Sequence, residues 1–144
     1  MKAFKENYNV LKSMLDTIDS SDDAAKRRTT FEEFSALLGK HAKVDEKVVY
    51  DALIATGDDE IEVDAHEGFA EHMLSDALIK KLKAGTDPLP AQWRAEAQVM
   101  QEIVEHHIKE EEDTVLDDVN DNFESAARGE MGNAFEKLKL EVAV

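Results

Sequence analysis

The stretches HAKVDEKVVYDAL (residues 41–53) and HHIKEEEDTVLDDV (residues 106–119) decide the fold expected for this chain. Each sets apolar residues at helical spacing and places a histidine four residues before a carboxylate. These pairs are His41 with Asp45 and His107 with Glu111. Residues four apart lie about one turn apart on the same face of an α-helix, so each pair can converge on one ion. A buried polar group without a partner costs roughly 1–3 kcal/mol, and a bound cation would offset that cost.

The rest of the chain repeats this helical periodicity and lacks the alternation typical of strands, so the predicted class is all-α. Polar turns separate the predicted helices. They run from Lys2 to Asp19, from Thr30 to about Thr56, from the acidic turn GDDEIEVD (57–64) to Gly85, from Ala91 onward, and from Ser125 to Leu140. Short connections between four long helices predict an up-down-up-down four-helix bundle with a short C-terminal fifth helix. We expect a single domain over residues 1–144.

Three of the five histidines are expected on inward helix stripes: His41, His72 and His107. His66 lies about 120° around its helix from His72 and is predicted to be exposed. His106 with Glu110 repeats the four-residue spacing, but apolar residues surround the stripe of His107. We therefore place His107 inward and His106 outward.

The composition limits the metal ligands and the binding partners that this chain can have. The chain has no cysteine, which excludes disulfides, thiolate zinc sites and iron-sulfur clusters, so a metal must take nitrogen and oxygen ligands. A formal charge of -16 argues against binding nucleic acid or an anionic membrane, because both would be repelled. No apolar run approaches the roughly 18–20 residues that span a bilayer. We expect a soluble, cytoplasmic protein.

These motifs resemble those of the hemerythrin-like domains, also called the HHE cation-binding family. The stretches at residues 41–53 and 106–119 look like the family's repeated pattern of a histidine followed by acids, and AEHMLSDALIKKL (70–82) is similar to its third helix. Trp93 and GEMGNAFEKLK (129–139) resemble the start of its fourth helix and its closing helix. The resemblance covers residues 1 to about 141. It implies a centre of two non-haem irons in the bundle core, with ligands His41, Asp45, His72, His107 and Glu111.

The chain departs from the family pattern at three positions. Tyr8 stands where the family usually has a histidine on the first helix, and we predict it either as a sixth ligand or as a packed core residue. Asp45 is one methylene shorter than the more usual glutamate, and Glu46 beside it could compensate. Gly68 stands where oxygen carriers have another histidine, which leaves at most six protein ligands instead of seven. Glu71 could fill a gap, although a hydrogen bond to a ligand is its more ordinary role.

The short ligand set favours handling or sensing of oxygen, peroxide, nitric oxide or iron over oxygen carriage. Whether the protein is an enzyme with peroxide- or oxygen-linked redox activity stays open. Manganese or zinc could replace iron, since both accept nitrogen and oxygen ligands. The alternative is a partly degenerate bundle, metal-free or with a single metal, that acts as an interaction module. The protein is expected to be a monomer or a homodimer.

Overall fold

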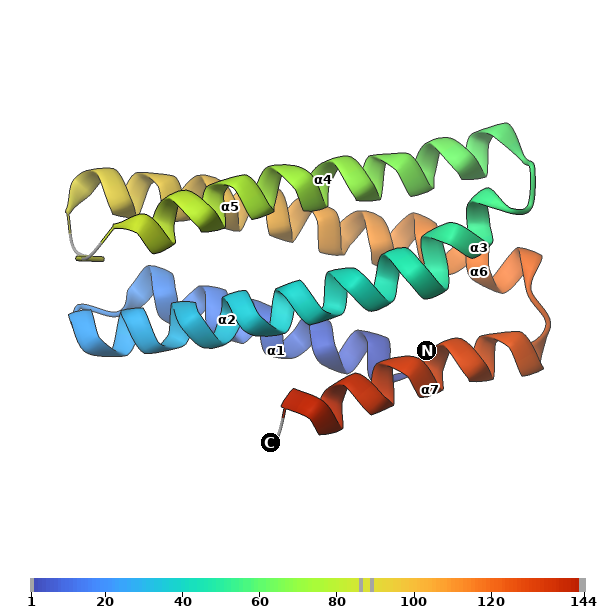
Figure 1. The fold of residues 1–144 in the computed structure, drawn as a ribbon, viewed down its shortest axis with the longest axis horizontal. Helices are drawn as coiled ribbons and strands as arrows, with labels where there is room; N and C mark the ends of the chain where they lie inside the picture. The colour runs from blue at the N-terminus through green and yellow to red at the C-terminus, as the bar shows by residue number, and fades with distance from the viewer. Residues whose placement is uncertain (1, 86, 89, 143–144) are drawn as a thin grey trace.

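The computed structural model describes residues 2–85, 87–88 and 90–142, without the side chains of residues 3 and 138–142. Four helical rods lie along the long axis of the molecule, the first of them shorter than the others, and a further helix lies along one side of it (Figure 1). The elements in chain order are α1 (Lys2–Ser20), α2 (Ala24–Val44), η1 (Asp45–Tyr50), α3 (Asp51–Ile54), α4 (Asp59–Ala84), α5 (Ala91–Glu110), η2 (Glu111–Val115), α6 (Leu116–Asn122) and α7 (Ser125–Val142), where η marks a π-helical turn. No strand occurs in this described part, so the all-α prediction is confirmed.

The connections alternate between the two ends of the bundle. The α1–α2 and α4–α5 connections lie at one end, and the α3–α4 and α6–α7 connections lie at the other (Figure 1). The second rod is therefore α2, η1 and α3 joined end to end, and the fourth is α5, η2 and α6. This order confirms the predicted up-down-up-down topology. Each rod can thus present one face to the common interior.

The second rod begins earlier than the sequence suggested. The prediction that Thr30 opens it is wrong, because α2 begins at Ala24. The side chain of Asp23 caps this helix by accepting hydrogen bonds from the backbone N–H groups of Ala25 and Lys26. Buried Arg27 in the first turn donates to the carbonyl of Pro88 at 3.0 Å and so ties the helix start to the α4–α5 connection. The N-cap formed by the side chain of Asp23 is of a kind that stabilises a helix by about 1 kcal/mol.

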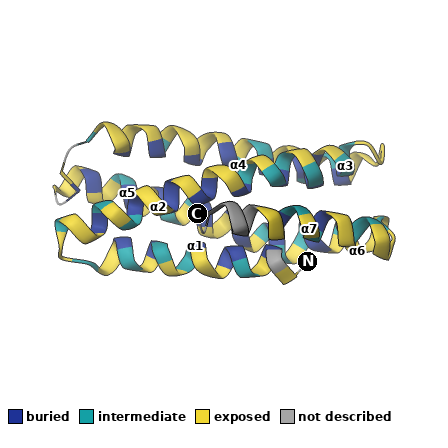
Figure 2. Cartoon of the chain, turned by 60° about the horizontal axis from the view of Figure 1, so that its bottom comes forward, coloured by how far each residue is buried: buried dark blue, intermediate teal, exposed yellow. Residues whose placement is uncertain are grey.

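The core is one continuous set of inward stripes (Figure 2). The sequence of α1 has apolar residues at spacings of three and four, which predicts an inward stripe. All of them are buried, namely Phe4, Tyr8, Leu11, Leu15 and Ile18. Helix α7 packs against α1 and α2 through Met131 and Phe135, whose ring centroid lies 4.7 Å from that of Phe4. The helical spacing of the sequence also predicts Leu138 on this face, but its side chain lies outside those that the structure describes. The fifth helix thus closes the side of the bundle where α1 and α2 meet.

Both motif-bearing rods contain a π-helical turn that begins at the carboxylate of the motif. In η1 the N–H of Asp51 bonds to the carbonyl of Glu46, and in η2 the N–H of Leu116 bonds to that of Glu111. A π-helical turn holds an extra residue and shifts the register of the residues after it. Regular helical spacing from His41 predicts that Val48 and Ala52 point inward, but with the shifted register both are only half-buried. After Asp45, the fully buried residues of this rod are Val49, Tyr50 and Leu53.

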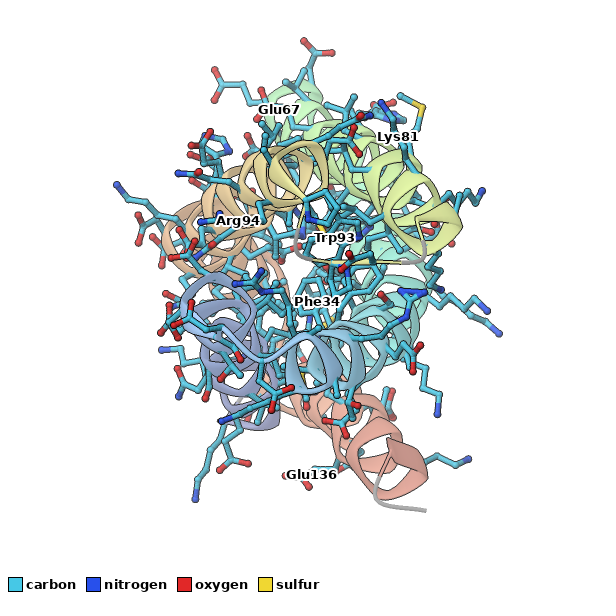
Figure 3. The ribbon with its side chains drawn as sticks, turned by 90° about the vertical axis from the view of Figure 1, so that its left-hand side faces the viewer. Phe34, Glu67, Lys81, Trp93, Arg94 and Glu136 are labelled. Atoms are coloured by element: carbon cyan, nitrogen blue, oxygen red, sulfur yellow. The ribbon has the colours of Figure 1, made fainter. Side chains whose placement is uncertain are left out.

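Large side chains fill the interior at the end far from α7. Seen along the bundle, Phe34 and Trp93 lie between the helices, whereas Glu67, Lys81, Arg94 and Glu136 lie at the periphery (Figure 3). The indole N–H of Trp93 donates to the carbonyl of Leu82 at 3.1 Å, which joins α5 to α4.

Among the described residues, no helix is both long enough and apolar enough to cross a membrane.

Candidate metal centre

Three rods bring four ligand-type side chains together inside the bundle. Asp45 comes from η1, His72 from α4, His107 from α5 and Glu111 from η2. One potential ligand atom from each residue lies within 4.8 Å of those of the others, and all four side chains are buried. Buried groups of this kind are normally paired or coordinate a metal. The cluster therefore suggests metal-cation binding.

Carboxylates behind the two histidines fix their orientation. The Nδ1 atom of His72 lies 2.8 Å from Oε1 of Glu46, and Nδ1 of His107 lies 3.3 Å from Oε1 of Glu71. The opposite nitrogens point inward, and the two Nε2 atoms are only 3.0 Å apart. When a carboxylate holds the Nδ1 proton of a neutral imidazole, the Nε2 lone pair is free to bind a metal. Glu71 thus forms a hydrogen bond to His107, which is the more ordinary of the two roles predicted for it.

The two buried carboxylates face one another across the same small space. Neither oxygen of Asp45, nor Oε2 of Glu111, has a hydrogen-bond partner among the described residues. Burial and the charge of Asp45 raise the pKa of Glu111 well above its usual range. Burial also acts to raise the pKa of Asp45, but the nearby Glu111 and the histidines outweigh it and lower that pKa. Two adjacent carboxyl groups cannot both ionise cheaply. A cation between them would remove that conflict.

His41 lies beside the four-residue cluster but outside it. Its side chain is 1% exposed, and its ring packs among those of Phe4, Tyr8 and Phe135 at centroid distances of 5.4, 4.7 and 5.1 Å. Neither ring nitrogen forms a hydrogen bond within the described chain. Burial lowers the pKa of His41 to about 4, so the imidazole is neutral at neutral pH. It has a free lone pair and a proton to donate.

Tyr8 reaches the same interior from α1. Its side chain is fully buried, and no described group forms a hydrogen bond with its hydroxyl. Burial, followed by the negative charges of Glu111 and Asp45, raises the pKa of Tyr8 well above 10.0. The hydroxyl therefore lies within electrostatic reach of both carboxylates. The ring contacts with Phe4 and His41 are equally those of a packed core residue.

Tyr50 belongs to the site and was not predicted. Its hydroxyl donates a hydrogen bond to Oε1 of Glu111 and lies 3.4 Å from Nε2 of His107. Regular α-helical spacing after Asp45 directs other residues inward, and only the extra residue of η1 brings Tyr50 there. The sequence held one indirect signal, a glycine at position 68 on the inward stripe of α4, which leaves room for a large side chain opposite.

The two remaining histidines are exposed, as predicted. His66 pairs only loosely with Glu62, at 3.6 Å. His106 lies on the outer face of α5, where Nδ1 is 2.6 Å from Oε2 of Glu71. Glu71 therefore contacts both neighbouring histidines, and only His107 enters the interior. The choice of His107 over His106 as the inward residue is confirmed.

A surface groove leads to one edge of the centre. It lies between α2 and α4, has a volume of about 450 Å³ and includes Glu46 and His72 in its wall. Lys43 and Lys83 also line it. On the other side of α4, a much smaller pocket of about 10 Å³ is lined by Tyr50, Gly68 and Glu111 and by several acidic residues. Small molecules have a route to the edge of the His72 ring through the groove.

The comparisons with known proteins agree with this centre. The family model described as the hemerythrin HHE cation-binding domain matches residues 2–119. No match was found among curated proteins or solved structures. Because the family model covers most of the chain, the chain belongs to the hemerythrin HHE cation-binding domain family.

Proposed function

We propose that this hemerythrin-family chain binds two non-haem irons and uses them to handle or sense oxygen, peroxide, nitric oxide or iron rather than to carry oxygen. The residues that would hold the metals are His41, Asp45, His72, His107, Glu111 and Tyr8. His41, His72 and His107 would supply imidazole nitrogens, Asp45 and Glu111 carboxylate oxygens, and Tyr8 a phenol oxygen. Bound iron would supply redox chemistry and coordination positions for small ligands.

One observation carries the proposal for two ions. Outside the four-residue cluster, His41 is completely buried and neither of its nitrogens has a partner in the described structure. A single ion held by the cluster would leave this imidazole unsatisfied, at a cost of roughly 1–3 kcal/mol. The unpartnered oxygens of Asp45 lie within electrostatic reach of both His41 and His107. A second cation beside His41 would satisfy these groups together.

The alternative is a single-metal or metal-free bundle that serves as an interaction module. The four-residue cluster favours the single-metal form, because its ligand atoms alone suffice for one ion. The metal-free form requires several unpartnered buried polar atoms to be tolerated without compensation. Manganese or zinc remains an alternative to iron, because the site offers only nitrogen and oxygen donors.

Metal analysis of protein expressed with supplemental iron tests the proposal. We expect about two irons per chain, and replacing the ligand histidines by alanine (His41→Ala and His107→Ala) should each lower that number. The matched control is His66→Ala, since His66 is exposed and is not a member of the cluster, and it should keep the wild-type content. One metal per chain, unchanged in His41→Ala, would support the single-metal alternative. Fewer than one per chain in the wild type would reject both metal proposals.

Anaerobic loading with ferrous iron, followed by exposure to oxygen, separates carriage from reaction. A carrier returns to its starting spectrum when oxygen is removed, whereas a redox or sensing centre stays oxidised until a reductant is added. We expect the second behaviour. Repeated reversible cycles without added reductant would contradict the proposed role.

A further inference from the structure

We propose that Tyr50 is a metal ligand of this centre, binding through its hydroxyl oxygen beside His107 and Glu111. This inference rests on the proposed function, since it requires a bound metal. It adds to the centre a residue that the histidine–carboxylate spacing does not indicate. Three features of the molecule support it: the turn that directs Tyr50 inward, the space left for its ring, and the atoms that surround its hydroxyl.

The π-helical turn η1 directs the side chain of Tyr50 toward the interior of the bundle. This turn starts at Asp45 and closes with the bond from the N–H of Asp51 to the carbonyl of Glu46. The extra residue rotates the later positions, so that Tyr50 is completely buried while Val48 is only half-buried. π-Helical turns in α-helices are rare and occur frequently at functional sites. Here the turn places a second side chain, after Asp45, against the same cluster.

Gly68 on α4 makes the space that the ring of Tyr50 occupies. A Cβ atom at position 68 would lie 2.4 Å from Cζ and 2.5 Å from the hydroxyl oxygen of Tyr50. Contacts this short do not occur, so any larger residue at position 68 would displace the ring. A glycine inside a helix makes the helix less stable than an alanine at the same position would. Helix α4 therefore has this destabilising residue at the position where the ring of Tyr50 lies close to its backbone.

The hydroxyl of Tyr50 lies among the ligand atoms themselves. It bonds to Oε1 of Glu111 and lies 3.4 Å from Nε2 of His107. An ion held by these two residues would thus have the Tyr50 oxygen within its reach. Phenolate oxygen is a hard donor that suits ferric iron and is an established protein ligand for it. On coordination the phenol would release its proton to solvent, as metal ligands do.

The two tyrosines of the chain, Tyr8 and Tyr50, allow a direct test. Phenolate bound to ferric iron gives a visible charge-transfer band and characteristic tyrosinate vibrations in resonance Raman spectra. In ferric-loaded Tyr8→Phe, Tyr50 is the only tyrosine, and we expect the band and vibrations to persist. In Tyr50→Phe, which keeps the ring, we expect the Tyr50 contribution to be lost. Iron content is measured on every sample.

Two results would overturn the proposal while leaving the proposed function intact. One is an iron-loaded Tyr8→Phe protein without tyrosinate signals, and the other is an iron-loaded Tyr50→Phe protein with the unchanged wild-type spectrum. Absence of iron from the wild type would instead overturn the proposed function and this inference together. The Tyr8→Phe result alone decides the matter if Tyr50→Phe fails to fold.

A glycine substitution gives an independent second test. Gly68→Ala should push the Tyr50 ring away from Glu111, and the Tyr50 signal should weaken or shift in the Tyr8→Phe background. Gly39→Ala is the matched control, because a Cβ at that position on α2 would meet nothing within 4 Å. Unchanged tyrosinate signals in folded, iron-loaded Gly68→Ala would contradict the assigned position of the hydroxyl.

Discussion

At the scale of single residues, Glu111 shows how the centre can be separated from the fold. Burial and Asp45 raise its pKa, so without metal the carboxyl group tends to stay neutral. Glutamine has nearly the same shape and can still accept the hydrogen bond from Tyr50. Glutamine lacks the negative charge that a cation requires. Substitution should therefore affect metal binding far more than folding.

We predict that Glu111→Gln changes the free energy of unfolding of metal-free protein by less than about 1 kcal/mol, within the range of shape-conserving changes. The same variant should lose most of the stabilisation that iron gives to the wild type. Denaturant unfolding with and without metal measures both quantities. Glu136→Gln, on the exposed face of α7, is the control and should behave as wild type. Equal metal stabilisation in Glu111→Gln and wild type would rule out Glu111 as a ligand.

The inward positions of the histidines and carboxylates could be predicted from the sequence, because each sits on an apolar stripe with helical period. His41, Asp45, His72, His107 and Glu111 are all buried, as expected. Their role as ligands stays a prediction. Tyr50 could not be predicted, since its direction depends on one extra residue in a turn. Periodicity describes regular helices and cannot say where a π-helical turn falls.

At the scale of elements, the π-helical turn η1 behaves as a one-residue insertion in an otherwise regular rod. Helix α2 before it and α3 after it both bury their apolar residues, even though the spacing between them contains an additional residue. Removing one exposed residue from the turn should restore α-helical hydrogen bonding without rotating either flank. Removing one from a regular part should rotate every later residue of the rod by about 100°.

We predict that deleting Lys47, exposed within η1, leaves a cooperatively folded bundle that is less stable by no more than about 2 kcal/mol. Deleting Lys40, equally exposed but in the regular part of α2, should abolish cooperative unfolding, because the buried stripe would no longer face one side. Circular dichroism during thermal unfolding compares the two. The interpretation of η1 as an absorbed insertion would be wrong if the Lys47 deletion were as damaging as the Lys40 deletion.

At the scale of the whole molecule, the centre joins three of the four rods and its protonation links metal binding to stability. Burial opposes charge on His107, but Asp45 and Glu71 outweigh it and raise the pKa of His107 from 6.5 to about 9. In metal-free protein the bound proton therefore stabilises the fold. That contribution is complete below pH 6.5 and is lost as the pH rises through about 9. Metal binding requires the neutral imidazole and releases this proton.

We predict that the stability of metal-free protein falls by about 3 kcal/mol between pH 6.5 and 9, while the difference between metal-loaded and metal-free protein widens. Unfolding curves at pH 6.5, 7.5 and 9, on chelator-treated and iron-loaded samples, give both trends. Metal-free His107→Ala should lack the decline, since it has no proton to lose at this position. If wild type and His107→Ala followed parallel curves over this range, the raised pKa of His107 would be wrong. Metal binding would then carry no proton cost at that residue, and the gap would not widen with pH.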